Sequence, residues 1–210
     1  MKKLEIDTPF GTANAHVNRA DKPRAALVLG HGAGGGVKAP DLVATSRVAH
    51  SVGLSVALVE QPYRVAGRRS PAPAHQLDAA WAAVVETLLA SELRGLSLIA
   101  GGRSSGARVA CRTANATGAV GVLCLAFPLQ PPRPSGAAPA PNRLPELDAV
   151  KVPTLVVQGA RDQFGMPPSS KQRTVVQVEG NHSLRSDLAA VEEAVGAWLL
   201  RVVQDMGRVL

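Results

Sequence analysis

Aromatic residues are scarce in this chain: Phe, Trp and Tyr together make up 3% of its 210 residues. Modules that stack nucleic-acid bases depend on aromatic side chains, and the chain also has no recognisable basic helix. The net charge of +7 is therefore interpreted as an arginine-rich solvated surface. We expect no nucleic-acid partner.

Cysteine and long hydrophobic runs are also rare. The two cysteines, Cys111 and Cys124, are too few for a disulfide scaffold and fall in apolar segments, so both are predicted to be buried free thiols. No apolar run approaches the ~18 residues of a membrane span. The first residues lack the apolar core of a secretory signal. We therefore expect no membrane association and a cytoplasmic location.

What the chain does contain is an alternation of strand-like and helix-like segments. Hydrophobic residues make up 46% and charged residues 19%, as in a globular protein, and the length suits a single domain over residues 1–210. The predicted strands are 3–7, 13–18, 25–29, the apolar run from 96, 120–125, 154–158 and 174–178, with a further strand at 54–59. The predicted helices are 40–51, 74–91, 105–113 and 186–203. This order favours an α/β fold with a mostly parallel, doubly wound sheet and helices on both faces.

One strand-to-helix junction carries a chemical motif. The apolar run from residue 96 leads into Gly102-Arg103-Ser104-Ser105-Gly106, and helix-forming residues follow at once. The G-x-S-x-G pattern is typical of a nucleophile elbow, in which small flanking residues let a tight turn expose a serine. Ser104 is the predicted nucleophile, since Ser105 lacks a glycine two positions before it.

Two later residues can complete a catalytic triad. A serine hydroxyl needs a base within hydrogen-bond reach, and the base needs a third group that orients it. Asp162 and His182 each follow a predicted strand, and the order Ser104, Asp162, His182 is that of α/β-hydrolases. Loops at the carboxyl ends of adjacent parallel strands converge. Glu60 is the weaker alternative for the acid, since it precedes Ser104.

The glycine-rich turn at His31-Gly32-Ala33-Gly34 suits an oxyanion hole. It lacks the Lys-Ser/Thr of a phosphate-binding loop and the spacing of a dinucleotide fingerprint. The predicted donors are the amides of Ser105 and Ala33, with Gly34 as the next candidate. His31 is expected to brace the turn. The other histidines, His16, His50 and His75, are interpreted as solvated or hydrogen-bonded surface residues. No cluster has metal-ligand spacing, so neither a metal nor a cofactor is expected.

Five segments carry a family resemblance, namely 31–35, 61–69, 101–108, 127–129 and 159–165. They resemble small, capless α/β-hydrolases of the dienelactone-hydrolase type. Within these, the chain is most similar to a bacterial group related to animal proteins of chromatin-regulating complexes and to a testis-expressed protein. The resemblance implies a serine hydrolase that cleaves a carboxylic ester or thioester through an acyl-enzyme on Ser104.

The chain departs from this family at three positions. Dienelactone hydrolases have a cysteine at the elbow, so Ser104 argues against that particular reaction. Related bacterial sequences often carry Met where Ser105 stands and His where Gln130 stands. Both of these changes fall at the expected pocket rim and leave the triad intact.

The substrate pocket is expected to be shallow and to take a small acyl compound. The proline-rich segment 127–145 is predicted to be a loop beside the site, because proline disfavours helices and interior strands. Substrate contacts are expected from Arg64, Arg68, Phe127, Gln130 and Phe164. Arginines at positions 64, 68, 69, 103 and 133 predict a preference for substrates with an anionic group remote from the scissile bond.

Other functions remain open at this point. The fold could serve as a non-catalytic interaction module, since fold does not fix function. A peptidase or a lipase of the same fold is a further alternative, although a lipase normally has a larger apolar lid. The expected assembly is a monomer or a homodimer.

Overall fold

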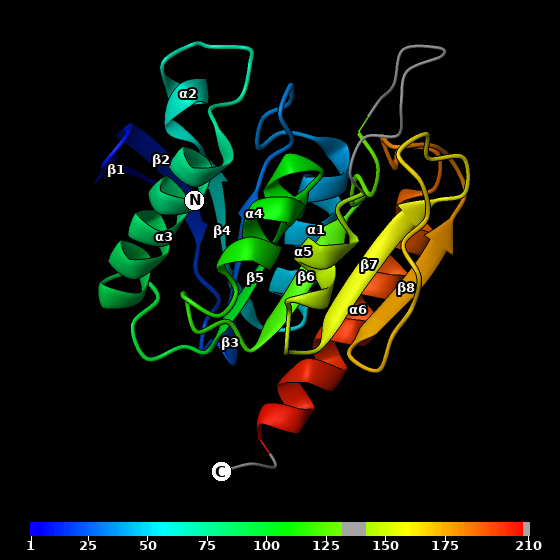
Figure 1. Cartoon of the computed structure of the whole chain (residues 1–210). Helices are drawn as coiled ribbons and strands as arrows, with labels where there is room; N and C mark the ends of the chain where they lie inside the picture. The colour runs from blue at the N-terminus through cyan, green and yellow to red at the C-terminus, as the bar shows by residue number, and fades with distance from the viewer. Residues whose placement is uncertain (132–141, 208–210) are drawn as a thin grey trace.

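One eight-stranded sheet organises the molecule, with the strand order β1-β2-β4-β3-β5-β6-β7-β8. The computed structural model describes residues 1–131 and 142–207. The strands are β1 (Lys2–Thr8), β2 (Gly11–Asn18), β3 (Ala25–Gly30), β4 (Leu54–Glu60), β5 (Leu98–Arg103), β6 (Gly121–Leu125), β7 (Thr154–Gly159) and β8 (Arg173–Val178). The sheet twists through the whole molecule, with the hairpin β1–β2 at one edge and β8 at the other (Figure 1).

The sheet is parallel except at the N-terminal edge. β1 pairs antiparallel with β2, and β2 pairs antiparallel with β4. Every later neighbour pair is parallel. All residues of the central strands β3 and β7 are buried, as expected where helices cover both faces of a parallel sheet.

Helices cover both faces of the sheet (Figure 1). One face packs against α1 (Pro40–Ser51) and α6 (Leu188–Met206), and the other against α3 (Ala74–Ala90), α4 (Ser105–Thr113) and α5 (Leu144–Asp148). Each face has its own hydrophobic core, centred on Trp198 and on Trp81 respectively. The predicted α/β architecture is thus confirmed.

The helix predicted at 74–91 is α3, and its apolar side faces the core. Leu77, Trp81 and Leu88 are buried against the sheet. Cys111 on α4 and Cys124 on β6 are both free and buried, with their sulfur atoms 3.5 Å apart. The prediction of buried free thiols is confirmed.

Two short helices were not predicted. α2 (Pro62–Val65) lies between the predicted strand 54–59 and the predicted helix 74–91, and α5 begins at Leu144, within the expected proline-rich loop. Both have a proline in the first turn, where its missing N–H costs nothing. A proline therefore marks the start of each helix. In segment 127–145, by contrast, proline was expected only to disfavour helices. Residues 132–141, including Arg133, lie outside the described residues.

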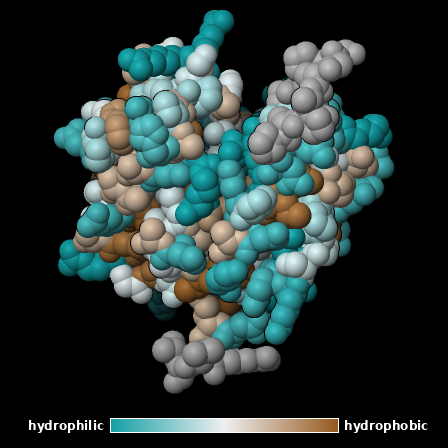
Figure 2. Space-filling view, in the orientation of Figure 1, coloured by the Kyte–Doolittle hydropathy of each residue, from teal (hydrophilic) through white to brown (hydrophobic). Residues whose placement is uncertain are grey.

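Polar residues dominate the outer surface of these layers. Hydrophilic side chains cover much of the face seen in Figure 2, and hydrophobic ones appear there as separate patches. Among the described residues, no helix combines the length and apolar character needed to cross a bilayer.

Candidate active site

Ser104 occupies a strained turn between β5 and α4. Its backbone has φ 52° and ψ −110°, in the left-handed half of conformational space that side-chain-bearing residues rarely adopt. Such a conformation costs on the order of 1–3 kcal/mol and persists only when the surroundings impose it. A hydrogen bond of 2.9 Å from Ser104 N to the Leu125 carbonyl helps to hold it.

Glycines make this turn possible by letting three backbone segments touch. A Cβ on Gly102 would lie 2.6 Å from the Gly30 carbonyl oxygen, and one on Gly106 would overlap the same carbonyl group. No larger residue fits at either place without moving β3 or α4. The two glycines of the sequence motif thus allow the close backbone contacts that a nucleophile elbow requires.

His182 links Ser104 to Asp162. Its Nε2 lies 2.9 Å from Ser104 Oγ, and its Nδ1 lies 2.8 Å from Asp162 Oδ2. The carboxylate can only accept, so Nδ1 carries the proton and Nε2 is left to accept the serine hydroxyl. The structure therefore brings the three residues predicted from the sequence into one hydrogen-bond chain.

Asp162 is itself held in place by β7 and its own turn. Gln158 Nε2 donates to Asp162 Oδ2 at 2.8 Å, and the Phe164 amide donates to Oδ1 at 2.9 Å. The same Gln158 nitrogen lies 2.9 Å from the Gly165 carbonyl oxygen. Sequence reasoning missed Gln158. The available signal was a glutamine in an otherwise apolar strand, since a buried amide needs partners.

Phe164 packs against the imidazole of His182. The two ring centroids lie 4.4 Å apart with an edge-on angle of 63°. The turn that carries the acid therefore also covers one side of the base. This places the predicted pocket residue Phe164 directly beside the reacting groups.

Arg103, the residue before Ser104, joins three segments around the site. Its Nε lies 2.8 Å from Asp41 Oδ2 at the start of α1, and its Nη2 donates to the His182 carbonyl oxygen at 3.0 Å. Its Nη1 packs so closely on Gly32 that a Cβ there would lie 2.8 Å from it. Arg103 was predicted to attract a substrate anion. Its guanidinium is instead used inside the protein.

Asp41 is the buried partner in this arrangement, with no solvent exposure of its side chain. Burial raises the pKa of Asp41, and the charge of Arg103 counteracts the rise. A buried carboxylate without its cation is strongly destabilising, so the pair fixes Arg103 in position. No local pattern predicts this pairing, since more than sixty residues separate Asp41 from Arg103.

His31 braces the glycine-rich turn, as predicted. Its Nδ1 donates to the Gly32 carbonyl at 2.8 Å, and its Nε2 accepts the amide N–H of Gln61 at 3.1 Å. Only the neutral ring can do both, and burial lowers the pKa of His31 accordingly. The Tyr63 hydroxyl donates to the Ala33 carbonyl at 2.9 Å. The turn is therefore tied to the segment after β4.

The expected oxyanion donors come from two segments next to Ser104, the start of α4 and the glycine-rich turn, whose Gly32 packs against Ser104. Ser105 is the first residue of α4, so its N–H has no acceptor within the helix. In the part of the chain that the structure describes, the amides of Ala33 and Gly34 have no hydrogen-bond acceptor either. These N–H groups are available to an incoming oxygen.

The other residues predicted to contact substrate differ in exposure: Arg64, Arg68 and Gln130 reach the surface, whereas Phe127 is buried. Arg64 is half-buried on α2, and its Nη1 lies 3.4 Å from the carbonyl oxygen of the exposed Arg68. Gln130 is exposed, and its backbone N–H donates to the Phe164 carbonyl at 2.8 Å. Phe127 is 0% exposed and belongs to the core. Its side chain is therefore not a pocket wall in this structure, because the end of β6 turns it inward.

Glu60, the alternative acid, has other partners. Its Oε2 accepts from His16 Nε2 at 2.9 Å and from Asn14 Nδ2 at 3.3 Å. Burial favours a higher pKa for Glu60, but these two hydrogen bonds outweigh burial and lower the pKa. Glu60 makes no contact with His182. Its hydrogen bond to His16 explains the role of that histidine, which was expected to be a solvated or hydrogen-bonded surface residue.

A cation site is not evident near these residues. Among residues 1–131 and 142–207, no group of three or more His, Cys, Asp or Glu side chains is arranged to hold a metal ion.

The neutral state of His31 predicts a pH-dependent stability. In the unfolded chain its pKa is about 6.5, and in the folded chain it is lower. Below about pH 6.5 the unfolded state therefore binds the extra proton, and the free energy of unfolding falls as pH falls, by at most about 1.4 kcal/mol per pH unit. Urea unfolding between pH 7.5 and 5.5 measures this slope. His31→Gln is expected to flatten the dependence of the unfolding free energy on pH, and His75→Gln, at an exposed histidine, is expected to leave it unchanged. Equal slopes in the wild type and both variants would contradict a neutral, buried His31.

Comparison with known proteins agrees with this geometry. A family model described as an alpha/beta hydrolase domain matches residues 23–193. No curated protein matches the chain.

Solved structures share the whole fold at low identity. An α/β serine hydrolase without a lid from Xanthomonas campestris is 19% identical, with 95% of this chain and 94% of that chain covered and a TM-score of 0.76. Est1E from Butyrivibrio proteoclasticus is 16% identical over 96% and 99% of the two chains, with a TM-score of 0.77. Dienelactone hydrolase from Anabaena variabilis is 15% identical over 95% and 96%, with a TM-score of 0.74. The similarity to small capless hydrolases expected from the sequence is confirmed, and the chain belongs to the alpha/beta hydrolase family.

Proposed function

We propose that this chain is a serine hydrolase that cleaves a carboxylic ester or thioester of a small acyl compound. The observation that carries the proposal is the continuous hydrogen-bond chain from Ser104 Oγ through His182 to Asp162. A serine in this arrangement has its base already in contact and the base already oriented. The strained elbow adds support, since such strain is typical of functional positions.

In the first half of the reaction, Ser104 Oγ attacks the carbonyl carbon while His182 Nε2 takes the hydroxyl proton. The carbonyl oxygen becomes an oxyanion that accepts hydrogen bonds from the amides of Ser105 and Ala33, with Gly34 as the alternative donor. The imidazolium is stabilised by Asp162. When the tetrahedral intermediate collapses, the C–O or C–S bond breaks and His182 returns the proton to the leaving alcohol or thiol.

In the second half, water replaces the leaving group. His182 removes a proton from the water, which attacks the acyl carbon, and the same proton returns to Ser104 as the carboxylic acid is released. The free amides beside Ser104 serve both steps, because the same oxyanion forms twice. No other group is needed for the atoms and charges to balance.

We expect small substrates at this site. Phe164 lies beside the base and offers an apolar surface, and the exposed Gln130, whose backbone N–H is bound to the Phe164 carbonyl, offers a polar one. Arg64, on the segment after β4, acts electrostatically on His31 of the glycine-rich turn, where its charge contributes to lowering the pKa of His31. We therefore assign a preference for remotely anionic acyl groups to Arg64 and withdraw Arg103 from that role.

The triad generates the first test. Ser104→Ala and His182→Ala are each expected to lower kcat on p-nitrophenyl acetate by factors on the order of 10³ to 10⁶, because each removes a group that acts in the transition state. Asp162→Asn should also lower kcat, and double variants should lose little more than single ones. Steady-state kinetics and fluorophosphonate labelling measure this. Ser170→Ala, at an exposed serine, is the matched control, and full activity or labelling in Ser104→Ala would exclude the mechanism.

Arg103 generates a second prediction as a positioning residue. Arg103→Lys keeps a cation beside Asp41, but lysine cannot also donate to the His182 carbonyl in the same geometry. We expect kcat to fall about 10- to 100-fold with little change in KM, since a base displaced by about 1 Å loses activity of that order. Arg161→Lys, which alters an exposed pair with Glu179, should leave kcat unchanged. A change in KM alone would show that Arg103 contacts substrate instead.

A substrate panel separates the proposed activity from its rivals. Esters and thioesters of graded acyl length, with one member derived from ferulic acid because that acid is bound to Est1E in one similar structure, should show an optimum at short or compact acyl groups. A lipase would favour long chains, and a peptidase would cleave amides. A non-catalytic interaction module would neither turn over any member nor react with a fluorophosphonate.

A further inference from the structure

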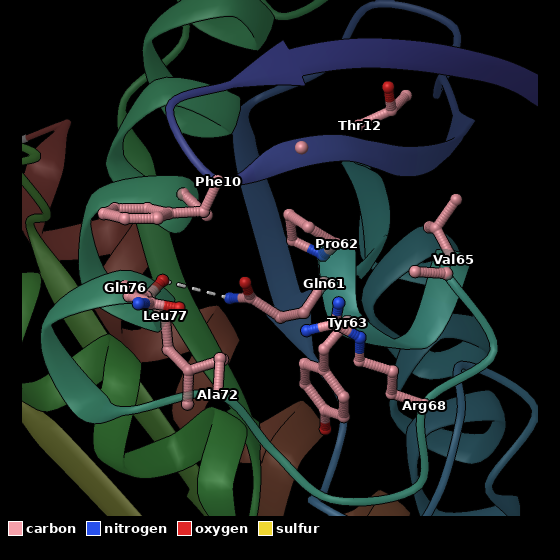
Figure 3. A pocket seen from close by; sticks show the side chains of 13 residues that line it. Phe10, Thr12, Gln61, Pro62, Tyr63, Val65, Arg68, Ala72, Gln76 and Leu77 are labelled. Atoms are coloured by element: carbon pink, nitrogen blue, oxygen red, sulfur yellow. Dashed lines mark hydrogen bonds between the residues drawn. The ribbon is translucent and has the colours of Figure 1, made fainter.

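A half-open cavity borders two residues that hold the glycine-rich turn, Gln61 and Tyr63. It has a volume of about 310 Å³ and is lined by the turn between β1 and β2, by α2 and the segment after it, and by the start of α3 (Figure 3). No triad residue and no predicted oxyanion donor lines it. Its size is that of a small-molecule site for a compound with a single ring or a short chain.

The walls of this cavity are mainly apolar. Figure 3 shows the ring of Phe10 and the side chains of Pro62 and Leu77 around one space, with the Tyr63 ring on the opposite wall. These surfaces come from three separate elements of the chain. A ligand that fills the space therefore needs an apolar body.

Arg68 gives the cavity one charged group. In the described part of the molecule its guanidinium has no hydrogen-bond or ion-pair partner, and no Asp or Glu lines the cavity. The backbone at Arg68 is fixed at both ends: its N–H donates to the Tyr63 carbonyl at 2.8 Å, and its carbonyl accepts from Arg64. An unpaired guanidinium on a fixed backbone, at the border of a mainly apolar space, is suited to a carboxylate, which it can bind through two hydrogen bonds.

Two residues of the cavity wall also hold the glycine-rich turn. The Tyr63 ring lines the cavity, and its hydroxyl donates to the Ala33 carbonyl. The Gln61 side chain lines the cavity and donates to the Leu77 carbonyl at 3.2 Å, and its backbone N–H donates to His31. A ligand that contacts both residues contacts the supports of the Ala33 amide.

We propose that this cavity is a second binding site, distinct from the triad, for a small carboxylate with an apolar body, and that its occupancy alters hydrolysis through the supports of the Ala33 turn. The carboxylate pairs with Arg68, and the apolar body packs between Phe10, Pro62 and Leu77. A ligand changes activity only if it binds the two states of the turn with different affinity. Binding and coupling are therefore separate measurements.

The binding test uses 3-phenylpropionate as probe and its neutral isostere 3-phenylpropanamide as control. Titrations followed by ¹⁵N NMR of the full chain should show saturable shifts at Phe10, Gln76 and neighbouring cavity residues. Arg68→Gln should weaken binding of the carboxylate about three- to tenfold, the range expected for one exposed charged hydrogen-bonded pair, and should not alter binding of the amide. Arg69→Gln is the matched control, since Arg69 is also exposed but does not line this cavity.

A cavity-filling variant locates the bound probe. Ala72→Trp, in the half-buried segment before α3, should abolish binding while the melting temperature stays near that of the wild type. If the Ala72→Trp protein is unfolded, the comparison of probe binding by the Arg68→Gln and Arg69→Gln proteins decides whether the cavity is the binding site. Absence of saturable binding, or equal binding by the Arg68→Gln and Arg69→Gln proteins, would overturn the proposal.

The coupling test uses hydrolysis of p-nitrophenyl acetate. Saturating 3-phenylpropionate should change kcat in the wild type and in Arg69→Gln, and the concentration needed should rise in Arg68→Gln by the same factor as the NMR affinity. Purely competitive inhibition that is insensitive to Arg68→Gln would place the probe at Ser104 and refute the second site. If no ester is hydrolysed at all, the proposed function fails, and the NMR titration still decides whether the cavity binds.

Discussion

The arrangement of the site depends on the close approach of Gly30, Gly102 and Gly106. The backbones of Gly102 and Gly106 approach the Gly30 carbonyl at distances that leave no room for a Cβ on either residue, so β3, β5 and α4 are locked together at the elbow. That contact imposes the positive φ of Ser104, because the residue between two packed segments has no other path. The hydroxyl is consequently held outward, and the first amide of α4 faces the same side.

Arg103 extends this constraint to the other loops of the site. It is the last residue of β5 and so shares the rigidity of the elbow, while its guanidinium contacts Gly32, Asp41 and the His182 carbonyl. A single side chain therefore sets the positions of the nucleophile, the glycine-rich turn and the base relative to one another. Burial of Asp41 strengthens the arrangement, since moving Arg103 would leave a carboxylate unpaired in the core.

The elbow, the order of the three polar residues and the parallel sheet could be predicted from the sequence because each is encoded locally. A G-x-S-x-G pattern requires only neighbouring residues, and polar residues directly after strands lie at one edge of a parallel sheet. The partners of Gln158 and Asp41 could not be predicted in the same way, although a glutamine in an apolar strand signals that Gln158 needs some partner. Their partners are brought near by the packing of β7 and α1, and neither residue stands in a pattern of its own. Phe127 shows the opposite error, since its position after a strand suggested a pocket and its side chain points into the core.

The glycine-rich turn is supported from both sides, and this has a consequence for how the site can be altered. On the triad side it rests on Arg103, which is bound to a buried carboxylate and has little freedom. On the other side it rests on Tyr63 and the Gln61 backbone, which border a cavity and an exposed loop. A ligand in the cavity can therefore reach the Ala33 turn only through Tyr63 and Gln61, which are themselves buried. A disturbance at Arg103, by contrast, displaces the base and the nucleophile together, because Arg103 precedes Ser104 and holds the His182 carbonyl.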